Sequence, residues 1–427
     1  MADLPYQRRV VDIELDELLS GVAAVSLEGP RAVGKTRTGM ERAATAYRLD
    51  LPETRAVLTA DPRRVAVGDR PVLVDEWQVL PETWDAVRHA VDADRTPGQF
   101  ILTGSAAPRE APVHPGAGRI VSLRMRPMSL AERGVGPPTV SLRTLLSGRR
   151  PAVEGQTGVS LDDYAREIVQ SGLPGLRGLP SRAIRAQLDG YIDQVIDRDF
   201  KELGGRSVRN PAALRRWLRA YAAAVSTTVS YEKIRDAATA GHDEKPTKVT
   251  VLNYLDTLER LWLIEPVPAW APSGTSLRRL AGGPKHQLAD PALAARLLGV
   301  HEDALLAGES GMRLFPGQES LLGALFESLV GLNLRVYAQV AEARVSHFRT
   351  RGGDHEIDFI IERPDQGVVA VEVKLARTIR DVDVRHVQWL RERIGDRLLD
   401  AVVISTGPEA YRRTDGVAVV PAVLLGP

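Results

Sequence analysis

The first third of the chain alternates short apolar runs with polar stretches. Val22–Leu27, Val72–Val74 and Phe100–Leu102 are apolar runs that predict buried strands. Lys35–Tyr47 follows a glycine-rich turn and is predicted to be a helix. Strands that alternate with helices are typical of a parallel α/β sheet, in which ligands bind at the carboxyl ends of the strands.

The middle of the chain has apolar residues at helical spacing and is predicted to be mostly helical. The expected helices are Asp162–Gln170, Arg182–Leu203, Pro211–Ala224, Tyr231–Ala238 and Pro246–Trp262, and the extended run Leu263–Trp270 follows them. A helix, a short helix, a loop, a longer helix and then a β-wing is the order of elements in a winged helix. We therefore expect a winged helix in this segment.

The last third returns to an α/β pattern. Helices are predicted at 291–298, 318–336 and 383–394, and period-two strands at 344–350, 355–361, 368–375 and 401–405. A Gly-, Pro- and Arg-rich stretch at 147–158 predicts a loop between domains. We divide the chain into three domains, residues 1–150, 151–272 and 273–427.

Composition excludes several classes of site. The 427 residues carry a formal net charge of +1 and include no cysteine. The lack of cysteine excludes disulfides, Cys-based zinc sites, iron–sulfur clusters and thiol catalysis, and the low net charge means that any basic surface must be local. The N-terminal stretch lacks the apolar core of a signal peptide, and no apolar run reaches the length of a membrane-spanning helix. We expect a cytoplasmic protein with no membrane partner.

Residues 29–36, Gly-Pro-Arg-Ala-Val-Gly-Lys-Thr, match the phosphate-loop pattern G-x-x-x-x-G-K-[ST] between a predicted strand and a predicted helix. Glycines let backbone N–H groups approach phosphates, Lys35 reaches the β- and γ-phosphates, and the Thr36 hydroxyl binds Mg²⁺. Only seven of the 56 basic residues are lysine, which argues against a chance match. The predicted cofactors are ATP and Mg²⁺, and the loop residues expected around the nucleotide are Gly29, Pro30, Arg31, Ala32, Val33, Gly34, Lys35, Thr36 and Arg37.

Two carboxylates follow the strand predicted at 72–74. Asp75 is expected to hold Mg²⁺, and Glu76 to orient or deprotonate the attacking water. An acidic pair also occurs in solvated loops, but its place about 40 residues after a phosphate loop favours the functional interpretation. Thr103 and Ser105 end the next strand, where one hydroxyl could contact the γ-phosphate; a plain turn is the alternative.

The order GPRAVGKT, VLVDEWQ, ILTGSA and LRMRPMSLAERG resembles the prokaryotic AAA-type ATPases that carry a C-terminal domain of unknown function. The resemblance continues through YIDQVIDRDFKELGG, KHQLADPALAARLLG and LFESLV. It implies a P-loop NTPase sheet with an extra strand between the phosphate-loop strand and the Asp-Glu strand, so that Thr103 and Ser105 lie between Lys35 and Asp75. It also implies an arginine supplied by a neighbouring protomer, and hence a homo-oligomer, and it puts Tyr6 and Arg9 near the adenine.

The predicted winged helix suggests DNA as a partner. Lys245 and Lys248 begin the long helix that would enter a groove, and Arg215, Arg216 and Arg219 could contact phosphates. The same long helix also carries acidic residues and an apolar face, and winged helices also serve as protein-binding modules. Both interpretations stay open.

The last domain contains a second candidate site. Strand alternation lets Asp358 converge with Glu372 and Lys374 of the next strand. Two carboxylates fit Mg²⁺, and a lysine fits stabilisation of developing charge. An acidic residue followed by Glu-x-Lys on the next strand resembles the PD-(D/E)XK nucleases, a restriction-endonuclease-like fold. The resemblance implies Asp358 and Glu372 as metal ligands, Lys374 as the catalytic lysine and Glu327 as an accessory acid.

Two alternatives to cleavage remain at that site: an amphipathic hairpin with a surface Glu–Lys pair, and a nuclease fold used only for binding. The sequence therefore predicts an ATP-dependent, Mg²⁺-dependent P-loop ATPase coupled to one of two functions. The first is DNA binding or processing through the nuclease-like domain. The second is a nucleotide-gated switch that binds DNA or a protein and does not cleave.

Overall fold

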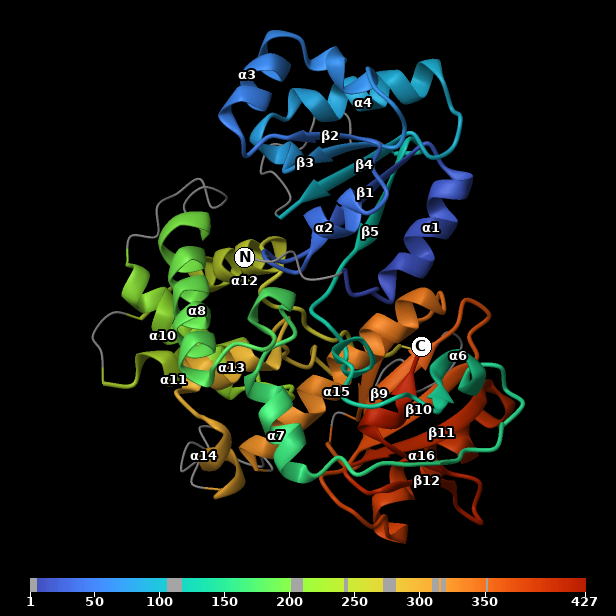
Figure 1. Ribbon diagram of the computed structural model, residues 1–427. Helices are drawn as coiled ribbons and strands as arrows, with labels where there is room; N and C mark the ends of the chain where they lie inside the picture. Colours follow the sequence, from blue (N-terminus) through green and yellow to red (C-terminus); the bar gives the residue numbers. More distant parts are fainter. Residues whose placement is uncertain are drawn as a thin grey trace.

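The computed structural model describes residues 6–105, 117–200, 210–241, 245–271, 282–308, 315, 320–350 and 352–427. Figure 1 shows an N-terminal sheet with its helices, a mostly helical middle region and a C-terminal sheet. Helix α15 (Leu321–Val340) lies between the middle helices and the C-terminal sheet. The domain boundary predicted at 272–273 falls outside the described residues, and residues 291–306, which the prediction assigned to the third domain, pack with the middle helices.

The N-terminal sheet is parallel and has the strand order β2-β3-β4-β1-β5. Its strands are β1 (Ala24–Glu28), β2 (Thr45–Arg48), β3 (Val72–Asp75), β4 (Phe100–Gly104) and β5 (Ile120–Arg124). The three central strands are near-continuous apolar runs, interrupted in β1 by the buried Ser26, because helices cover both faces of such a sheet. Strand β4 pairs with β1 on one side and β3 on the other, which is the inserted strand that the resemblance implied.

The helix predicted over 35–47 is wrong in its second half. Helix α2 ends at Met40, and residues 45–48 form edge strand β2, which pairs with β3. Gly39 lies so close to the sheet that a Cβ there would come within 2.8 Å of Leu73 Cδ1. Pairing with β3 overrides the helix propensity of a stretch that is rich in Ala, Glu and Arg. The remaining helices of this domain are α1 (Val11–Gly21), α3 (Pro52–Ala60) and α4 (Glu82–Ala93).

The middle region consists of α7 (Leu161–Val169), α8 (Ser181–Gln194), α10 (Pro211–Ala223), α11 (Tyr231–Thr239), α12 (Lys248–Arg260), α13 (Pro291–Leu298) and α14 (Glu302–Leu306). The predicted helices are present, and α8 continues into a π-helical turn at Val195–Asp199; residues 201–203 lie outside the described part. The predicted extended run forms antiparallel bridges from Ile264 to Leu288 and from Val267 to Lys285. The winged helix itself stays a prediction.

The C-terminal domain is built on a seven-stranded sheet in the order β7-β12-β13-β11-β10-β9-β8. Its strands are β7 (Gly155–Gln156), β8 (Arg344–Arg349), β9 (Glu356–Glu362), β10 (Val368–Val373), β11 (Leu398–Ser405), β12 (Glu409–Arg412) and β13 (Ala418–Pro421), with α16 (Asp381–Ile394) before β11. Strands β8, β9 and β10 are antiparallel, whereas β10, β11 and β13 are parallel.

The segment that follows the N-terminal sheet packs against the C-terminal domain. It contains α5 (Leu130–Arg133), β6 (Val140–Ser141) and α6 (Leu142–Leu145). Strand β6 pairs with β14 (Leu425–Gly426) at the end of the chain, and β7 extends the edge of the large sheet. The segment around residues 140–156 is therefore held to the C-terminal domain by backbone hydrogen bonds.

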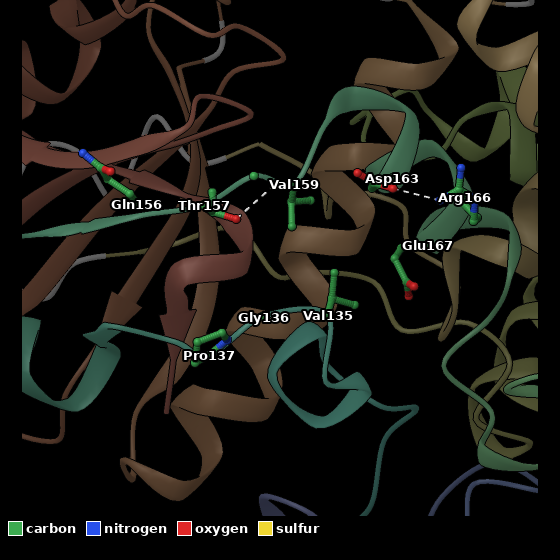
Figure 2. Close-up of a pocket in the computed structure, with 10 residues that line it drawn as sticks. Val135, Gly136, Pro137, Gln156, Thr157, Val159, Asp163, Arg166 and Glu167 are labelled. Atoms are coloured by element: carbon green, nitrogen blue, oxygen red, sulfur yellow. Dashed lines mark hydrogen bonds and ion pairs between the residues drawn. The ribbon is translucent and has the colours of Figure 1, made fainter.

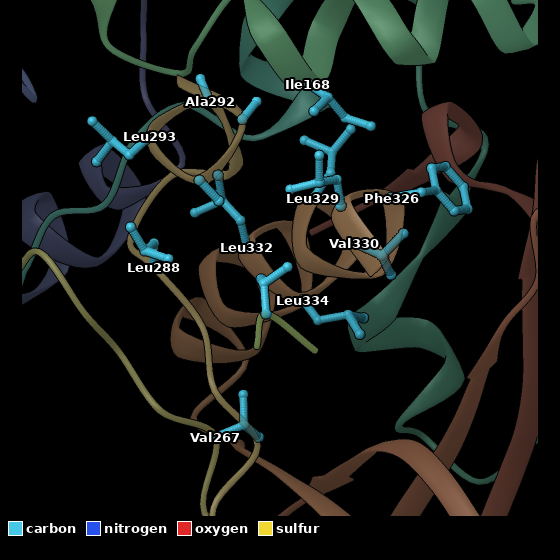
Figure 3. Close-up of a cluster of buried hydrophobic side chains, with 14 of the residues drawn as sticks. Ile168, Val267, Leu288, Ala292, Leu293, Phe326, Leu329, Val330, Leu332 and Leu334 are labelled. Carbon is cyan, nitrogen blue, oxygen red and sulfur yellow. The ribbon is translucent and has the colours of Figure 1, made fainter. Parts of the chain in front are cut away.

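Helix α15 is the centre of the largest hydrophobic core. Figure 3 shows its Phe326, Leu329 and Leu332 packed among side chains from α7 and α13. Among the described residues, helix α15 is long enough and apolar enough to cross a membrane. The sequence had been predicted to contain no membrane-spanning helix. The apolar window of α15 is 89% buried inside the protein, so its hydrophobic surface is already covered by the neighbouring helices and the sheet.

Candidate functional sites

The phosphate loop lies between β1 and α2 and is shaped by two glycines. Gly29 has φ +151° and a Cβ there would come within 2.1 Å of the Met125 carbonyl oxygen, so no side chain fits. Gly34 precedes α2 in the left-handed conformation, with φ 106°. The Lys35 ammonium is buried and donates to the carbonyl oxygens of Gly29 and Pro30, both at 2.8 Å. Burial lowers the pKa of Lys35 to about 8, against the attraction of Glu76 and Asp75.

The two predicted magnesium ligands are neighbours. Thr36 Oγ1 donates to Asp75 Oδ1 at 2.8 Å, and the Thr103 hydroxyl donates to the same oxygen. Adjacent ligands of an octahedral Mg²⁺ with bonds of about 2.1 Å lie roughly 3.0 Å apart, so the 2.8 Å spacing of the Thr36 and Asp75 oxygens is close to what this ion needs. Burial raises the pKa of Asp75, which the hydrogen bonds from Thr103 and Thr36 oppose.

Glu76 is held in position from the neighbouring strand. Its backbone is in the left-handed conformation, with φ 58°, and its N–H donates to Thr103 Oγ1 at 3.1 Å. Ser105 Oγ donates to Glu76 Oε1 at 2.9 Å, and Gln78 donates to Glu76 Oε2. Strained backbone at a non-glycine residue is typical of functional sites. Thr103 and Ser105 therefore orient Asp75 and Glu76 through direct hydrogen bonds.

Other predicted loop residues connect the loop to the rest of the protein. The Val33 carbonyl accepts from Arg9 Nη1 at 2.8 Å, so Arg9 holds the loop; its place near an adenine stays a prediction. Arg31 forms a 3.0 Å ion pair with Asp199 of the π-helical turn, and Arg37 forms a 2.9 Å pair with Glu41. Ala32 has φ 60° at the turn of the loop.

Comparison with known proteins agrees with this geometry. Residues 22–133 match the model of an AAA domain. This match includes the phosphate loop and the Asp75–Glu76 pair and supports a P-loop ATPase fold for this part of the chain. Residues 161–304 and 322–425 match two domains of unknown function, DUF8612 and DUF4143.

Two curated relatives are similar over most of the chain. Uncharacterized proteins of Mycobacterium tuberculosis and Mycobacterium bovis are each 27% identical over 364 residues, which covers 83% of this chain and 71% of theirs. Among solved structures, a Walker-type ATPase of Pyrococcus abyssi is 17% identical, with a TM-score of 0.40 over 69% of this chain and 99% of that one.

The second candidate site lies on the C-terminal sheet. Asp358 on β9 accepts the backbone N–H of Val373 on Oδ2 at 2.9 Å, which fixes its carboxylate against β10. Glu372 is 2% exposed, and its Oε2 lies 3.2 Å from Lys374 Nζ. Glu372 Oε1 is buried without a hydrogen-bond partner. The three residues predicted from the sequence, together with Glu327, line one cavity of about 550 Å³.

A buried lysine that sequence analysis missed lies among these acids. Lys285 Nζ is 2.8 Å from Glu327 Oε1, 3.1 Å from Asp358 Oδ1 and 3.4 Å from Glu356 Oε1. The side chain of Lys285 is fully buried. Its signal in the sequence is its rarity: Lys285 and Lys374 are two of only seven lysines.

The acids of this cluster are perturbed in opposite directions. Burial raises the pKa of Glu327 to about 8, against the attraction of Lys285. Burial also raises the pKa of Glu372 well above its usual range, and the nearby Asp358 adds to the shift. Burial opposes ionisation of Asp358 too, but Lys285 and Lys374 hold the pKa of this carboxyl below its usual value.

The basic residues predicted to contact DNA are on the surface of the middle region. Lys245 pairs with Asp236 at 2.7 Å and Lys248 with Glu232 at 3.2 Å, both on α11. Arg215 pairs with Asp193. These pairs partly neutralise the lysines at the start of α12.

A third hollow lies beside α7 and has a volume of about 500 Å³. Figure 2 shows that it is lined by the loops around Pro137 and Thr157 and by polar residues of α7. Its charged side chains already pair: Arg166 with Asp163 at 2.8 Å, and Glu167 with Arg177 at 2.8 Å. The residues predicted from the sequence lie elsewhere.

Proposed function

We propose that the protein binds and hydrolyses Mg²⁺–ATP at the phosphate loop and transmits the nucleotide state to its middle and C-terminal domains. The observation that carries the first part is the four-part site of Lys35, Thr36, Asp75 and Glu76. Lys35 neutralises the β- and γ-phosphates, Thr36 and Asp75 hold the metal, and Glu76 orients the attacking water. Cytoplasmic action on a DNA partner and assembly of several protomers belong to the same proposal.

Two substitutions separate binding from turnover. Lys35→Ala removes the ammonium that contacts the phosphates, so ATP affinity should be lost. Glu76→Gln should keep ATP bound while turnover falls by about 10²–10⁴-fold, because only the water-activating carboxylate is lost. Fluorescent-nucleotide binding and phosphate release measure the two effects, and the exposed Glu82→Gln is the matched control. Unchanged ATP affinity in Lys35→Ala would refute the proposed nucleotide site.

A continuous set of contacts supports transmission from the loop. Arg9 donates to the Val33 carbonyl and, through Nη2, to the Arg126 carbonyl at 2.7 Å. Arg126 follows β5 and its Nη2 lies 2.8 Å from Glu265 Oε1. Glu265 also pairs with Arg335 of α15 at 3.3 Å. Helix α15 carries Glu327 two turns earlier, so a shift of the phosphate loop has a physical route to the C-terminal cavity.

Hydrogen exchange in the Glu76→Gln background tests this route. ATP should change the protection of α15 and β9, and Arg126→Met should abolish that change while ATP still binds. Arg119→Met is the matched control, because Arg119 lies at the other end of β5 and pairs with Asp92 on the surface. An identical ATP response in Arg126→Met would exclude Arg126 as the connection.

DNA binding or processing is the proposed output, with a switch that does not cleave as the alternative. The cavity that contains Asp358, Glu372 and Lys374 is also lined by Lys233, Arg349 and Arg385, which suit a phosphate backbone. The fold around it has a helix, three antiparallel strands, a helix and a parallel strand, the order of elements that we expect of a nuclease-like core.

Binding and cleavage are measured separately. Affinity for linear and branched DNA should fall steeply with salt concentration if phosphates are contacted; flat or absent binding would point to a protein partner. Cleavage with Mg²⁺ or Mn²⁺, with and without ATP, is compared with Glu372→Ala. Cleavage that this substitution abolishes would establish a nuclease, and equal inertness of the two proteins would favour the switch.

A further inference from the structure

The nuclease resemblance implies a divalent cation between Asp358 and Glu372, and the side chains present do not fit one. Asp358 Oδ1 is 3.1 Å from the Nζ of Lys285, a lysine outside the motif, whereas Glu372 Oε2 is 3.2 Å from the Nζ of Lys374, which the motif itself includes. The second Asp358 oxygen accepts the Val373 N–H. Among the described residues, no group of three or more His, Asp or Glu side chains is arranged to hold a metal ion.

We infer that the Lys285 ammonium is a built-in cation that takes the place of a divalent metal in the C-terminal acidic cluster and excludes one from it. Of the two proposed outputs, this inference favours the switch that does not cleave. An ammonium has three donors, and here three carboxylates surround it, those of Glu327, Asp358 and Glu356. A Mg²⁺ ion bound to the Glu327 and Asp358 oxygens at about 2.1 Å would overlap the ammonium that bridges them.

The lysine is anchored from its backbone as well as its head group. Its N–H donates to the Val267 carbonyl at 2.9 Å, and its carbonyl accepts from the Val267 N–H at 2.8 Å. Its stem reaches the cluster from the middle region, with Nζ 5.7 Å from the Phe359 ring centroid. Because the side chain is fully buried, it cannot leave the cluster unless this backbone pairing or α15 moves.

The choice of lysine is itself informative. Arginine is the basic residue at 49 of 56 positions in this chain, yet the compact ammonium occurs here. A planar guanidinium is larger and presents its donors in a fixed fork. The ammonium is a compact point charge, so it fits among three converging carboxylates in the way that a metal ion would.

Removing the ammonium should therefore create a metal site. The experiment measures Mn²⁺ bound to the nucleotide-free full-length chain by electron paramagnetic resonance, with Asp75→Asn present throughout to silence the phosphate-loop metal. The chain with Lys285 intact should bind no Mn²⁺ at submillimolar concentration. Lys285→Met keeps the apolar stem and should bind one Mn²⁺ per chain, and adding Asp358→Asn should remove it.

Two further measurements make the test decisive. Lys233→Met removes a lysine at the exposed rim of the same cavity and should create no Mn²⁺ site. Mn²⁺ should raise the unfolding temperature of the Lys285→Met variant and of none of the others. This measurement remains informative if the unbalanced carboxylates destabilise Lys285→Met in the absence of metal. The inference would be overturned if the protein with Lys285 intact bound Mn²⁺ and Asp358→Asn abolished that binding. It would also be overturned if Lys285→Met folded and bound no Mn²⁺.

Discussion

The low pKa of Lys35 makes ATP affinity depend on pH in a range where an ordinary lysine would not titrate. Burial lowers this pKa to about 8 in the nucleotide-free protein. The triphosphate requires the charged ammonium, so binding must first protonate any neutral Lys35. Affinity should therefore fall as the pH rises through 8, in proportion to the protonated fraction of the free protein.

The magnitude follows from that value. With a pKa of about 8, Lys35 is roughly 90% protonated at pH 7 and roughly 10% protonated at pH 9. Affinity for Mg²⁺–ATP should fall about tenfold between the two, or about 1.4 kcal/mol. A lysine with the ordinary pKa of about 10.4 would be almost fully charged at both pH values and would give almost no change.

Isothermal titration of Mg²⁺–ATP into Glu76→Gln at several pH values measures the effect without turnover. Lys35→Met supplies the control: it should bind weakly at pH 7, and its affinity should not fall further up to pH 9. A flat profile for the lysine protein between pH 7 and pH 9 would refute the argument from burial. An equal decline in the Lys35→Met variant would assign the pH dependence to another group.

Two predictions concern the stability and shape of the same region. Gly29→Ala should abolish ATP binding, because its Cβ would lie 2.1 Å from the Met125 carbonyl oxygen; Gly21→Ala, where nothing lies within 4 Å, should bind normally in the same assay. Glu265→Gln should lower the unfolding temperature measured by calorimetry, with a cost of about 3–5 kcal/mol, because it leaves Arg124, Arg126 and Arg335 around a neutral partner. Although burial opposes it, these arginines hold the pKa of Glu265 well below its usual range, so its contribution is complete at neutral pH and is lost as the pH falls below about 4.3. An unchanged transition in Glu265→Gln would show that the cluster adds no net stability.

Local pattern determined the parts of this protein whose chemistry is contiguous in the chain. The phosphate loop needs two glycines, a lysine and a hydroxyl within eight residues, so its identity is readable without a fold. The central strands were equally clear, because a strand covered on both faces must be an apolar run. The position of Asp75 and Glu76 at the end of β3 was predictable for the same reason: they follow such a run directly.

Tertiary structure decided the parts that depend on distant partners. Residues 45–48 became a strand because β3 offered backbone partners, which no local propensity encodes. Lys285 lies 73 residues from Asp358 in sequence and 3.1 Å from it in space. By our inference, the Lys285 side chain decides whether the Asp, Glu and Lys residues of the two adjacent strands can hold a metal. That side chain comes from a distant part of the sequence. Electrostatic balance in a buried site is a sum over everything nearby, and a sequence motif contains only some of its terms.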